Sequence, residues 1–349
     1  MKTEFLLVGQ GLCGTWLSYF LEQENRDFLV IDPGNLPTAS RQAGGLINPV
    51  TGRRLVTTWL IEELMPFAHT HYNRMGQLLN ATLIDERSVV QFFSHPDTKA
   101  IFKERSAQAG DYLQLPADRP AGTEAFLSPE GFGIIKKSFQ IRLEQLLPAY
   151  KNYLLQKGRL VEQKFTLEGL EQLPDGFRFE DIEFDYLLFC DGIGAHDNSF
   201  FSHLPFAPVK GEALIVAIPG LSTSHVFKGP LTLIPLSTPG HWWVGSSYEW
   251  SFLDPHPSVD FHRDTVQKLK DWLQLPFTIV DHWAAVRPGS KERRPFVGML
   301  DAHPNIGLLG GMGTKGCSLA PFFAHQLVQH LLYHQPIHSE ASLSRFRRN

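Results

Sequence analysis

A glycine-rich turn between two apolar runs, all within the first 32 residues, constrains the fold of this chain more than any other feature. Residues 5–8 and 28–31 are short continuous apolar runs, the pattern of strands covered on both faces of a parallel sheet. Between them lie Gly-Gln-Gly-Leu-Cys-Gly at 9–14 and a segment at 15–24 whose apolar residues have helical spacing. This order predicts a strand–helix–strand unit with a right-handed crossover.

The turn has the GxGxxG pattern, in which each glycine has a physical task. Gly9 permits a tight turn, Gly11 lets the backbone approach a pyrophosphate, and Gly14 lets the helix pack closely on the sheet. Unpaired N–H groups at the helix N-terminus attract phosphate, and Asp32 ends the next strand, where a carboxylate can accept hydrogen bonds from an adenosine ribose. We therefore expect a dinucleotide site, the alternative being a turn that merely joins strand to helix. The residues assigned to it here are Gly9, Gly11, Leu12, Cys13, Gly14, Asp32 and Pro33.

The composition fits a folded protein and favours no macromolecular partner. The chain has 349 residues, of which 43% are hydrophobic and 19% charged. Its net charge of −4 argues against a nucleic-acid surface. Basic clusters at 53–54, 293–294 and 345–348 nevertheless leave RNA as an alternative partner. The cysteines, at 13, 190 and 317, show no CxxC spacing, which indicates a reducing compartment, with the cytoplasm as the default. We expect no metal site and no membrane span, and the oligomeric state stays open.

A second set of motifs lies toward the C-terminus. Residues 285–298 read Ala-Val-Arg-Pro-Gly-Ser-Lys-Glu-Arg-Arg-Pro-Phe-Val-Gly, and the cluster at 310–316, Gly-Gly-Met-Gly-Thr-Lys-Gly, opens a final helix. With the N-terminal turn, Ala-Ser-Arg-Gln-Ala-Gly-Gly at 39–45 and Cys-Asp-Gly-Ile-Gly-Ala at 190–195, this order resembles the D-amino-acid oxidase family of FAD-dependent oxidoreductases over nearly the whole chain.

Within that family, two kinds of member are similar to different stretches. Residues 287–291 and 295–298 resemble glycine oxidase. Residues 245–248, 313–321 and 335–337 resemble the oxidase half of the bifunctional enzyme that finishes 5-methylaminomethyl uridine in tRNA. Both likenesses imply oxidation of an amine next to a carboxylate, on a small-molecule amine or amino-acid substrate.

The order of elements and motifs predicts an α/β protein with two parts. A Rossmann-like FAD-binding domain with a parallel sheet is expected from residues 1–80, 138–205 and 285–349. An inserted α+β substrate domain with a mainly antiparallel sheet is expected from residues 81–137 and 206–284. Helical spacing further predicts helices at 59–79 and 139–156, whereas 82–137 is expected to be irregular with a short strand at 88–93.

The resemblance also implies where FAD binds. The segment after the second strand is expected to wrap the phosphates and ribityl chain, and the C-terminal glycine loop to direct N–H groups at the flavin pyrimidine ring. The backbone near Phe165 is expected to contact the adenine. The residues assigned in this way are Ser40, Arg41, Gln42, Ala43, Gly44, Gly45, Phe165, Gly192, Gly311, Gly313, Thr314, Lys315 and Gly316.

Three residues are candidates for the catalytic site. Arg287 is the expected substrate clamp, because a guanidinium binds a carboxylate through two hydrogen bonds; the alternative is a structural pair with an acid such as Asp301. Tyr248 is either a hydrogen-bonding group for the substrate or a residue at the rim. Lys315 either places a positive charge at the flavin or substrate carboxylate, or points to solvent.

Three positions at which this sequence differs from members of the family limit the reactions to be expected. No cysteine stands near Arg287 where sarcosine oxidase attaches its flavin, so FAD is expected to be non-covalent. Trp243 stands in place of a lysine that reacts with oxygen there, which leaves the electron acceptor open, and Thr232 in place of the substrate tyrosine of D-amino-acid oxidase argues against D-amino acids. A 2-hydroxy-acid oxidoreductase, a tRNA-modification oxidase and a redox-silent dinucleotide-binding protein remain as alternatives.

Overall fold

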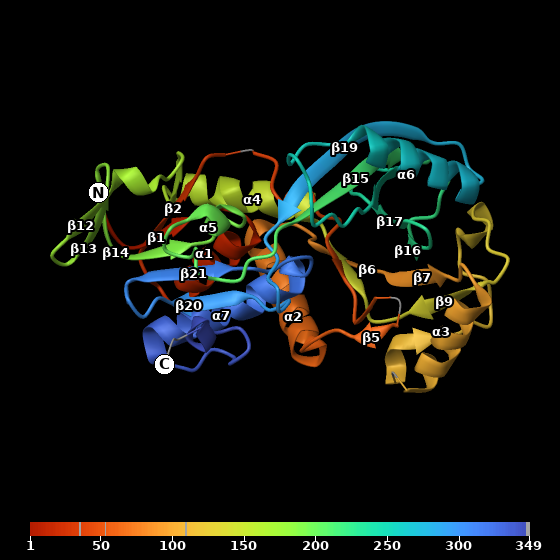
Figure 1. The fold of residues 1–349 in the computed structure, drawn as a ribbon, viewed down its shortest axis with the longest axis horizontal. Helices are drawn as coiled ribbons and strands as arrows, with labels where there is room; N and C mark the ends of the chain where they lie inside the picture. The colour runs from red at the N-terminus through yellow and green to blue at the C-terminus, as the bar shows by residue number, and fades with distance from the viewer. Residues whose placement is uncertain (35, 53, 109, 347–349) are drawn as a thin grey trace.

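The computed structural model describes residues 1–34, 36–52, 54–108 and 110–346 and contains two large sheets (Figure 1). Figure 1 shows one sheet, together with both chain termini, in the left half of the molecule and the other sheet in the right half. Arg53, Arg347 and Arg348 of the expected basic clusters lie outside the described residues. Within the described ranges, no helix is long and apolar enough to cross a membrane.

The first sheet has the glycine turn at the end of its central strand. Its order is β11-β2-β1-β14-β13-β12, and β14 also pairs with β21, which pairs with β20. Pairings among β11, β2, β1, β14 and β21 are parallel, whereas β12, β13 and β20 add antiparallel edges. The strands are β1 (Lys2–Val8), β2 (Phe28–Asp32), β11 (Leu160–Glu162), β12 (Leu170–Leu173), β13 (Gly176–Phe179), β14 (Ile182–Phe189), β20 (Phe296–Met299) and β21 (Ile306–Gly310).

The apolar runs of this sheet are buried on both faces, as the sequence predicts. In β1, Phe5 and Leu7 face one apolar cluster, whereas Leu6 and Val8 face another. The first cluster is built with four helices, and Trp16 at its centre meets the ring of Tyr72 edge-on at 4.8 Å. These helices are α1 (Leu12–Gln23), α2 (Ile61–Leu79), α4 (Leu143–Gln156) and α7 (Gly316–Tyr333); the short α5 (Gly194–Asp197) belongs to the second cluster.

The second sheet is antiparallel except for one pair, β16 with β7. Its order is β19-β15-β18-β17-β16-β7-β9-β8. Leu269 and Trp272 of α6 (Val259–Trp272) cover one face, whereas Trp243 on the other face reaches the first half of the molecule. The strands are β7 (Ser88–Phe92), β8 (Leu113–Gln114), β9 (Phe132–Ile135), β15 (Val209–Ala217), β16 (His225–Lys228), β17 (Thr232–Pro235), β18 (His241–Gly245) and β19 (Thr278–Arg287).

The two sheets confirm the predicted fold class, a parallel sheet with helices plus a mainly antiparallel sheet. The remaining elements are smaller. These are β3 (Leu46–Ile47), β4 (Val50–Thr51), β5 (Val56–Thr57), β6 (Ile84–Glu86), β10 (Phe139–Ile141) and α3 (Pro96–Gln108), with 3-10 turns at Gly110–Tyr112, Thr123–Ala125, Leu167–Gly169 and Leu343–Phe346. The residue ranges assigned to the two domains stay a prediction.

Two local expectations differ from the structure. The helix predicted from residue 139 begins at Leu143, because Phe139 pairs through its backbone with Ile47 and Glu86 in a small sheet. Helix α3 lies in the stretch expected to be irregular. Its sequence is mostly polar and shows no apolar periodicity, because Phe102 is its one fully buried side chain. The Phe102 ring packs against Gly133, where a side chain would leave it no room.

Candidate active site

The GxGxxG turn packs against the ends of three strands. Gly9 has φ +101°, a conformation that favours glycine, and its N–H donates to the carbonyl oxygen of Ile31 (2.8 Å). A Cβ on Gly14 would lie 1.8 Å from the carbonyl oxygen of Gly9, so the start of α1 can approach β1 this closely because Gly14 has no side chain. Gly11 faces a side chain instead, since its Cβ would lie 3.1 Å from the hydroxyl of Ser40.

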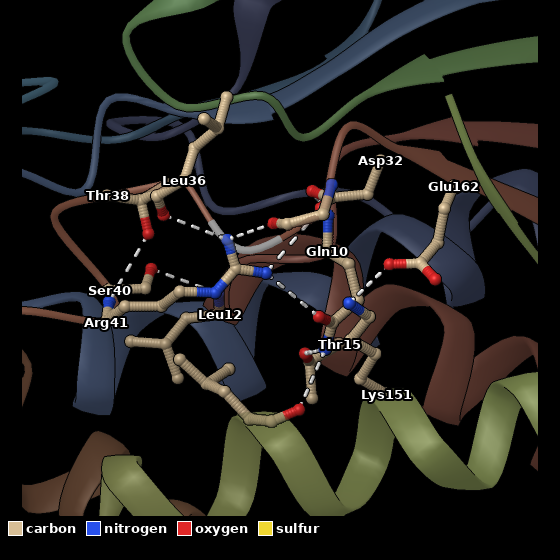
Figure 2. Close-up of polar contacts among 12 residues, drawn as sticks. Gln10, Leu12, Thr15, Asp32, Leu36, Thr38, Ser40, Arg41, Lys151 and Glu162 are labelled. Atoms are coloured by element: carbon tan, nitrogen blue, oxygen red, sulfur yellow. Dashed lines mark hydrogen bonds and ion pairs between the residues drawn. The ribbon is translucent and has the colours of Figure 1, made fainter. Parts of the chain in front are cut away.

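Asp32 and Arg41 form the polar rim of this turn (Figure 2). The Asp32 carboxylate accepts hydrogen bonds from the backbone N–H groups of Gln10 (2.8 Å) and Gly34 (2.9 Å). The Arg41 guanidinium lies 3.5 Å from the same carboxylate and donates to the carbonyl oxygen of Gly34 (2.7 Å). A positive charge is therefore held beside the N-terminus of α1, where both would attract a phosphate.

Residues 40–45 lie between the glycine turn and the second sheet. The Leu12 N–H donates to the Ser40 hydroxyl (3.1 Å), and Trp243 Nε1 donates to the carbonyl oxygen of Gln42 (3.0 Å). Gln140, itself buried, donates to the carbonyl oxygen of Gly44 (3.3 Å). Sequence reasoning missed the positioning contacts of Trp243 and Gln140, because both reach across elements distant in the chain.

The C-terminal glycine loop meets the N-terminal turn. A Cβ on Gly316, the first residue of α7, would lie 3.3 Å from the side chain of Leu12, the first residue of α1. The structure thus brings two helix N-termini together, as the motif order predicts. Gly313, with φ +55°, donates its N–H to the carbonyl oxygen of Pro288 (3.0 Å), which ties this loop to the residue after Arg287. Thr314 in the same loop is exposed.

Lys315 points away from bulk water rather than into it. Its Nζ donates to the hydroxyl of Thr58 (3.1 Å), and the side chain is partly buried. Burial, together with the positive charge of Lys228, lowers the pKa of Lys315 to about 8. The solvent-facing alternative for Lys315 is therefore not what the structure shows.

Arg287 ends β19 and lies flat over a neighbouring strand. A Cβ on Gly211 of β15 would lie 1.9 Å from the Arg287 guanidinium, so the arginine occupies the space that a side chain there would fill. It donates to the carbonyl oxygen of Ser247 (3.1 Å), and its Cζ lies 5.9 Å from the ring centre of the half-exposed Tyr248. Among the described residues, no carboxylate lies within ion-pair distance of Arg287, and burial lowers its pKa.

A buried carboxylate fixes the backbone that supports Arg287. Glu212 is fully buried and accepts hydrogen bonds from the N–H (2.6 Å) and hydroxyl (2.7 Å) of Ser258, while its own N–H donates to the hydroxyl of Ser247 (2.9 Å). Lys210 lies 3.4 Å from the Glu212 carboxylate, and His282 lies 2.9 Å from it. The loop at 247–258 is therefore pinned at both ends.

The remaining assigned residues lie around the end of β14 and β2. Gly192 follows β14 with φ +64°, and Pro33 is exposed directly after Asp32. Phe165 packs against Phe179 and Phe189 just beyond β11, whose last pairing partner in β2 is Asp32. Ala43 is partly buried against the helical cluster and Cys13 is buried within it.

Asp191 is a site feature that sequence reasoning did not assign, although its place between a strand and Gly192 was a signal. One of its carboxylate oxygens is buried without a hydrogen-bond partner in the described structure, as is the amide oxygen of Gln42. Burial raises the pKa of Asp191 to about 7. Unpaired buried acceptors beside a glycine cradle fit a ligand that brings hydroxyl donors, such as the sugar hydroxyls of a dinucleotide.

A family model described as FAD dependent oxidoreductase matches residues 4–330. The chain belongs to this family. It is a FAD-dependent oxidoreductase, and FAD is its cofactor. Within the described residues, no group of three metal-ligating side chains is placed to hold a metal ion.

Relatives and solved structures agree with this assignment. Glycine oxidase of Pseudomonas putida is 24% identical over 92% of both chains. The crystal structure of glycine oxidase from Geobacillus kaustophilus has a TM-score of 0.81 at 14% identity, covering 99% of this chain and 100% of that one. Iminodiacetate oxidase from Chelativorans sp. BNC1 has a TM-score of 0.77 at 16% identity, covering 97% and 99%. The two solved structures show that the fold is shared.

Alanine at two of the turn's glycines should have different effects. Gly14→Ala should lower the free energy of unfolding of the FAD-free protein by about 3 kcal/mol or more, because its Cβ would meet backbone. Gly11→Ala should mainly weaken FAD binding, by roughly tenfold or more, since the Ser40 side chain can rotate away. Urea unfolding and FAD titration would measure both. Equal loss of stability in the two variants would contradict this account.

Asp191 should make stability depend on pH. Because burial raises its pKa from 3.8 to about 7, the folded state holds a proton that the unfolded state has released between those values. Asp191 therefore contributes to the free energy of unfolding below about pH 4, and this contribution is lost as the pH rises through about 7. Relative to Asp191→Asn, the FAD-free wild type should lose a few kcal/mol of unfolding free energy over this range. A constant difference in urea unfolding would refute it.

Proposed function

We propose that this protein oxidises the carbon–nitrogen bond of an amino acid or an N-substituted glycine, with the substrate carboxylate held by Arg287 and a hydride passing to FAD. The observation that carries this proposal is the state of Arg287: a partly buried guanidinium with no carboxylate partner among the described side chains, next to the loop that opens α7. Relatives named glycine oxidase and a neighbour named iminodiacetate oxidase support an amine adjacent to a carboxylate.

The residues around Arg287 have complementary tasks in this proposal. When bound, FAD supplies the hydride acceptor. Arg287 orients the substrate by two hydrogen bonds to its carboxylate, and Tyr248 closes the outer side. Lys315 places a positive charge at the α7 N-terminus, where it stabilises developing negative charge. The amine reacts in its neutral form, because a protonated nitrogen has no electron pair to assist hydride loss.

The cofactor would bind along the line from Asp32 to Gly313. We assign the ribose to Asp32, with Pro33 and Phe165 at the adenine end, and the pyrophosphate to the glycine turn and Arg41. Residues 40–45 and Gly192 would follow the ribityl chain, and residues 311–316 the flavin ring. In this proposal FAD binds non-covalently in the domain predicted from residues 1–80, 138–205 and 285–349, and faces the predicted substrate domain.

Anaerobic flavin bleaching tests the function directly. Glycine, sarcosine or iminodiacetate should bleach the flavin absorbance of the purified holoenzyme, whereas glycolate and lactate should not. The distinction arises because hydride loss is assisted by the nitrogen electron pair. Bleaching by the hydroxy acids alone would replace the proposal with a 2-hydroxy-acid oxidoreductase. A bound flavin that none of these compounds reduces would indicate a redox-silent protein.

Removing the clamp should weaken substrate binding and leave FAD bound. Arg287→Met should raise the apparent Kd for the reducing amine roughly 10- to 100-fold, because hydrogen bonds to a charged group contribute about 1.5–3 kcal/mol. Arg263, exposed on α6, offers a matched control, and Arg263→Met should bind as the wild type does. Stopped-flow reduction at increasing substrate concentration provides the measurement. An unchanged Kd in Arg287→Met would place the carboxylate elsewhere.

A further inference from the structure

Lys228 and Lys315, one from each half of the molecule, lack a negative partner among the described residues. Lys228 ends β16 and Lys315 opens α7, and both are partly buried. Across the described ranges, no carboxylate lies within ion-pair distance of either Nζ. Burial lowers the pKa of both lysines, and the charge of Lys228 acts on Lys315. Keeping two unpaired cations close together costs free energy that an anionic ligand would offset.

The strand register places Lys228 on the same face of the second sheet as Arg287. Lys228 is opposite Thr232, Thr232 is opposite Gly245, and Gly245 is opposite Ala213. Alternate residues of a strand share a face, so Val209, opposite Arg287, lies on the Ala213 face. This is the face from which Trp243 reaches Gln42.

The floor between the two cationic ends is made of small residues and the Trp243 ring, which lies over Gly245: a Cβ there would be 2.9 Å from the ring. Gly211 lies beneath the Arg287 guanidinium, and Ala213, Gly245 and Thr232 continue the row toward Lys228. Three strand spacings separate the backbones of β15 and β16, at most about 14 Å. Lys315 donates to Thr58, which follows β5, and Val50 and Leu55 of the same segment pack in one cluster with Val226 of β16.

We propose that Lys228 binds a second carboxylate of the substrate, across this face of the sheet from Arg287. The substrate class is then an amino compound with two carboxylates, such as an N-carboxyalkyl amino acid or an acidic amino acid. The proposal rests on the proposed function for the role of Arg287. It adds Lys228 as a specificity-determining residue that selects dianions over monoanions, because each charged hydrogen bond to a carboxylate favours the longer, doubly charged ligand.

Binding to the oxidised holoenzyme tests this without turnover. Pairs of acids with equal chain length, butyrate with succinate and valerate with glutarate, would be titrated while the flavin absorbance is followed. In the wild type, the dicarboxylate should bind roughly tenfold or more tightly than its monocarboxylate partner. Lys228→Met should raise the dicarboxylate Kd to about that of the monocarboxylate. Lys270→Met, which removes an exposed lysine of α6 on the opposite face of the sheet, should keep the preference.

Several results would overturn the inference. These are an absence of dianion preference in the wild type, equal weakening of both acids in Lys228→Met, loss of the preference in Lys270→Met, or loss of FAD from Lys228→Met. An intact preference combined with slower reoxidation by oxygen in Lys228→Met would assign the lysine to the electron acceptor instead. Failure of the proposed function is separate, because it would appear as a flavin that no amine reduces, whatever the acids bind.

Discussion

The close approach of two helix N-termini is the constraint on which the rest of the site depends. Leu12 at the start of α1 lies against Gly316 at the start of α7, although more than three hundred residues of chain separate them. Each N-terminus presents unpaired N–H groups and a partial positive charge. The packed helices hold these two partial positive charges in place, although they repel each other. A dinucleotide, which carries negative charge on its phosphates, would therefore be attracted to this point.

Side chains from two other sheets hold the segment that lies beside the start of α1. Trp243 of β18 and Gln140 of β10 both bond carbonyl oxygens in the segment at 40–45, which itself bonds the start of α1 through Ser40. The segment at 40–45 is therefore held from two sides by side chains that carry no redox chemistry. Glu212 acts similarly on the other strand pair, since its buried carboxylate holds the loop that receives Arg287.

Local patterns predicted the parts of the fold that local physics determines. The strand at 5–8, the glycine turn and Asp32 lie within one continuous unit, so spacing alone revealed them. By contrast, Phe139 forms a strand because Ile47 and Glu86 lie beside it, and that long-range pairing leaves no local periodicity. Helix α3 could not be predicted either, because only one of its apolar residues is fully buried. The place of Lys228 on the same face as Arg287 depends on the register of five strands, which no local pattern shows.

One hydrogen bond, from the Gly313 N–H to the carbonyl oxygen of Pro288, joins the loop that opens α7 to the residue that follows Arg287. Arg287 ends a strand of the second sheet, whereas α7 packs against strands of the first, so this contact links the two halves of the molecule at the candidate site. A displacement of the strand end that carries Arg287 would therefore be passed on to the glycine loop. The residues proposed to bind the substrate carboxylate and those proposed to face the flavin are coupled in this way through the backbone.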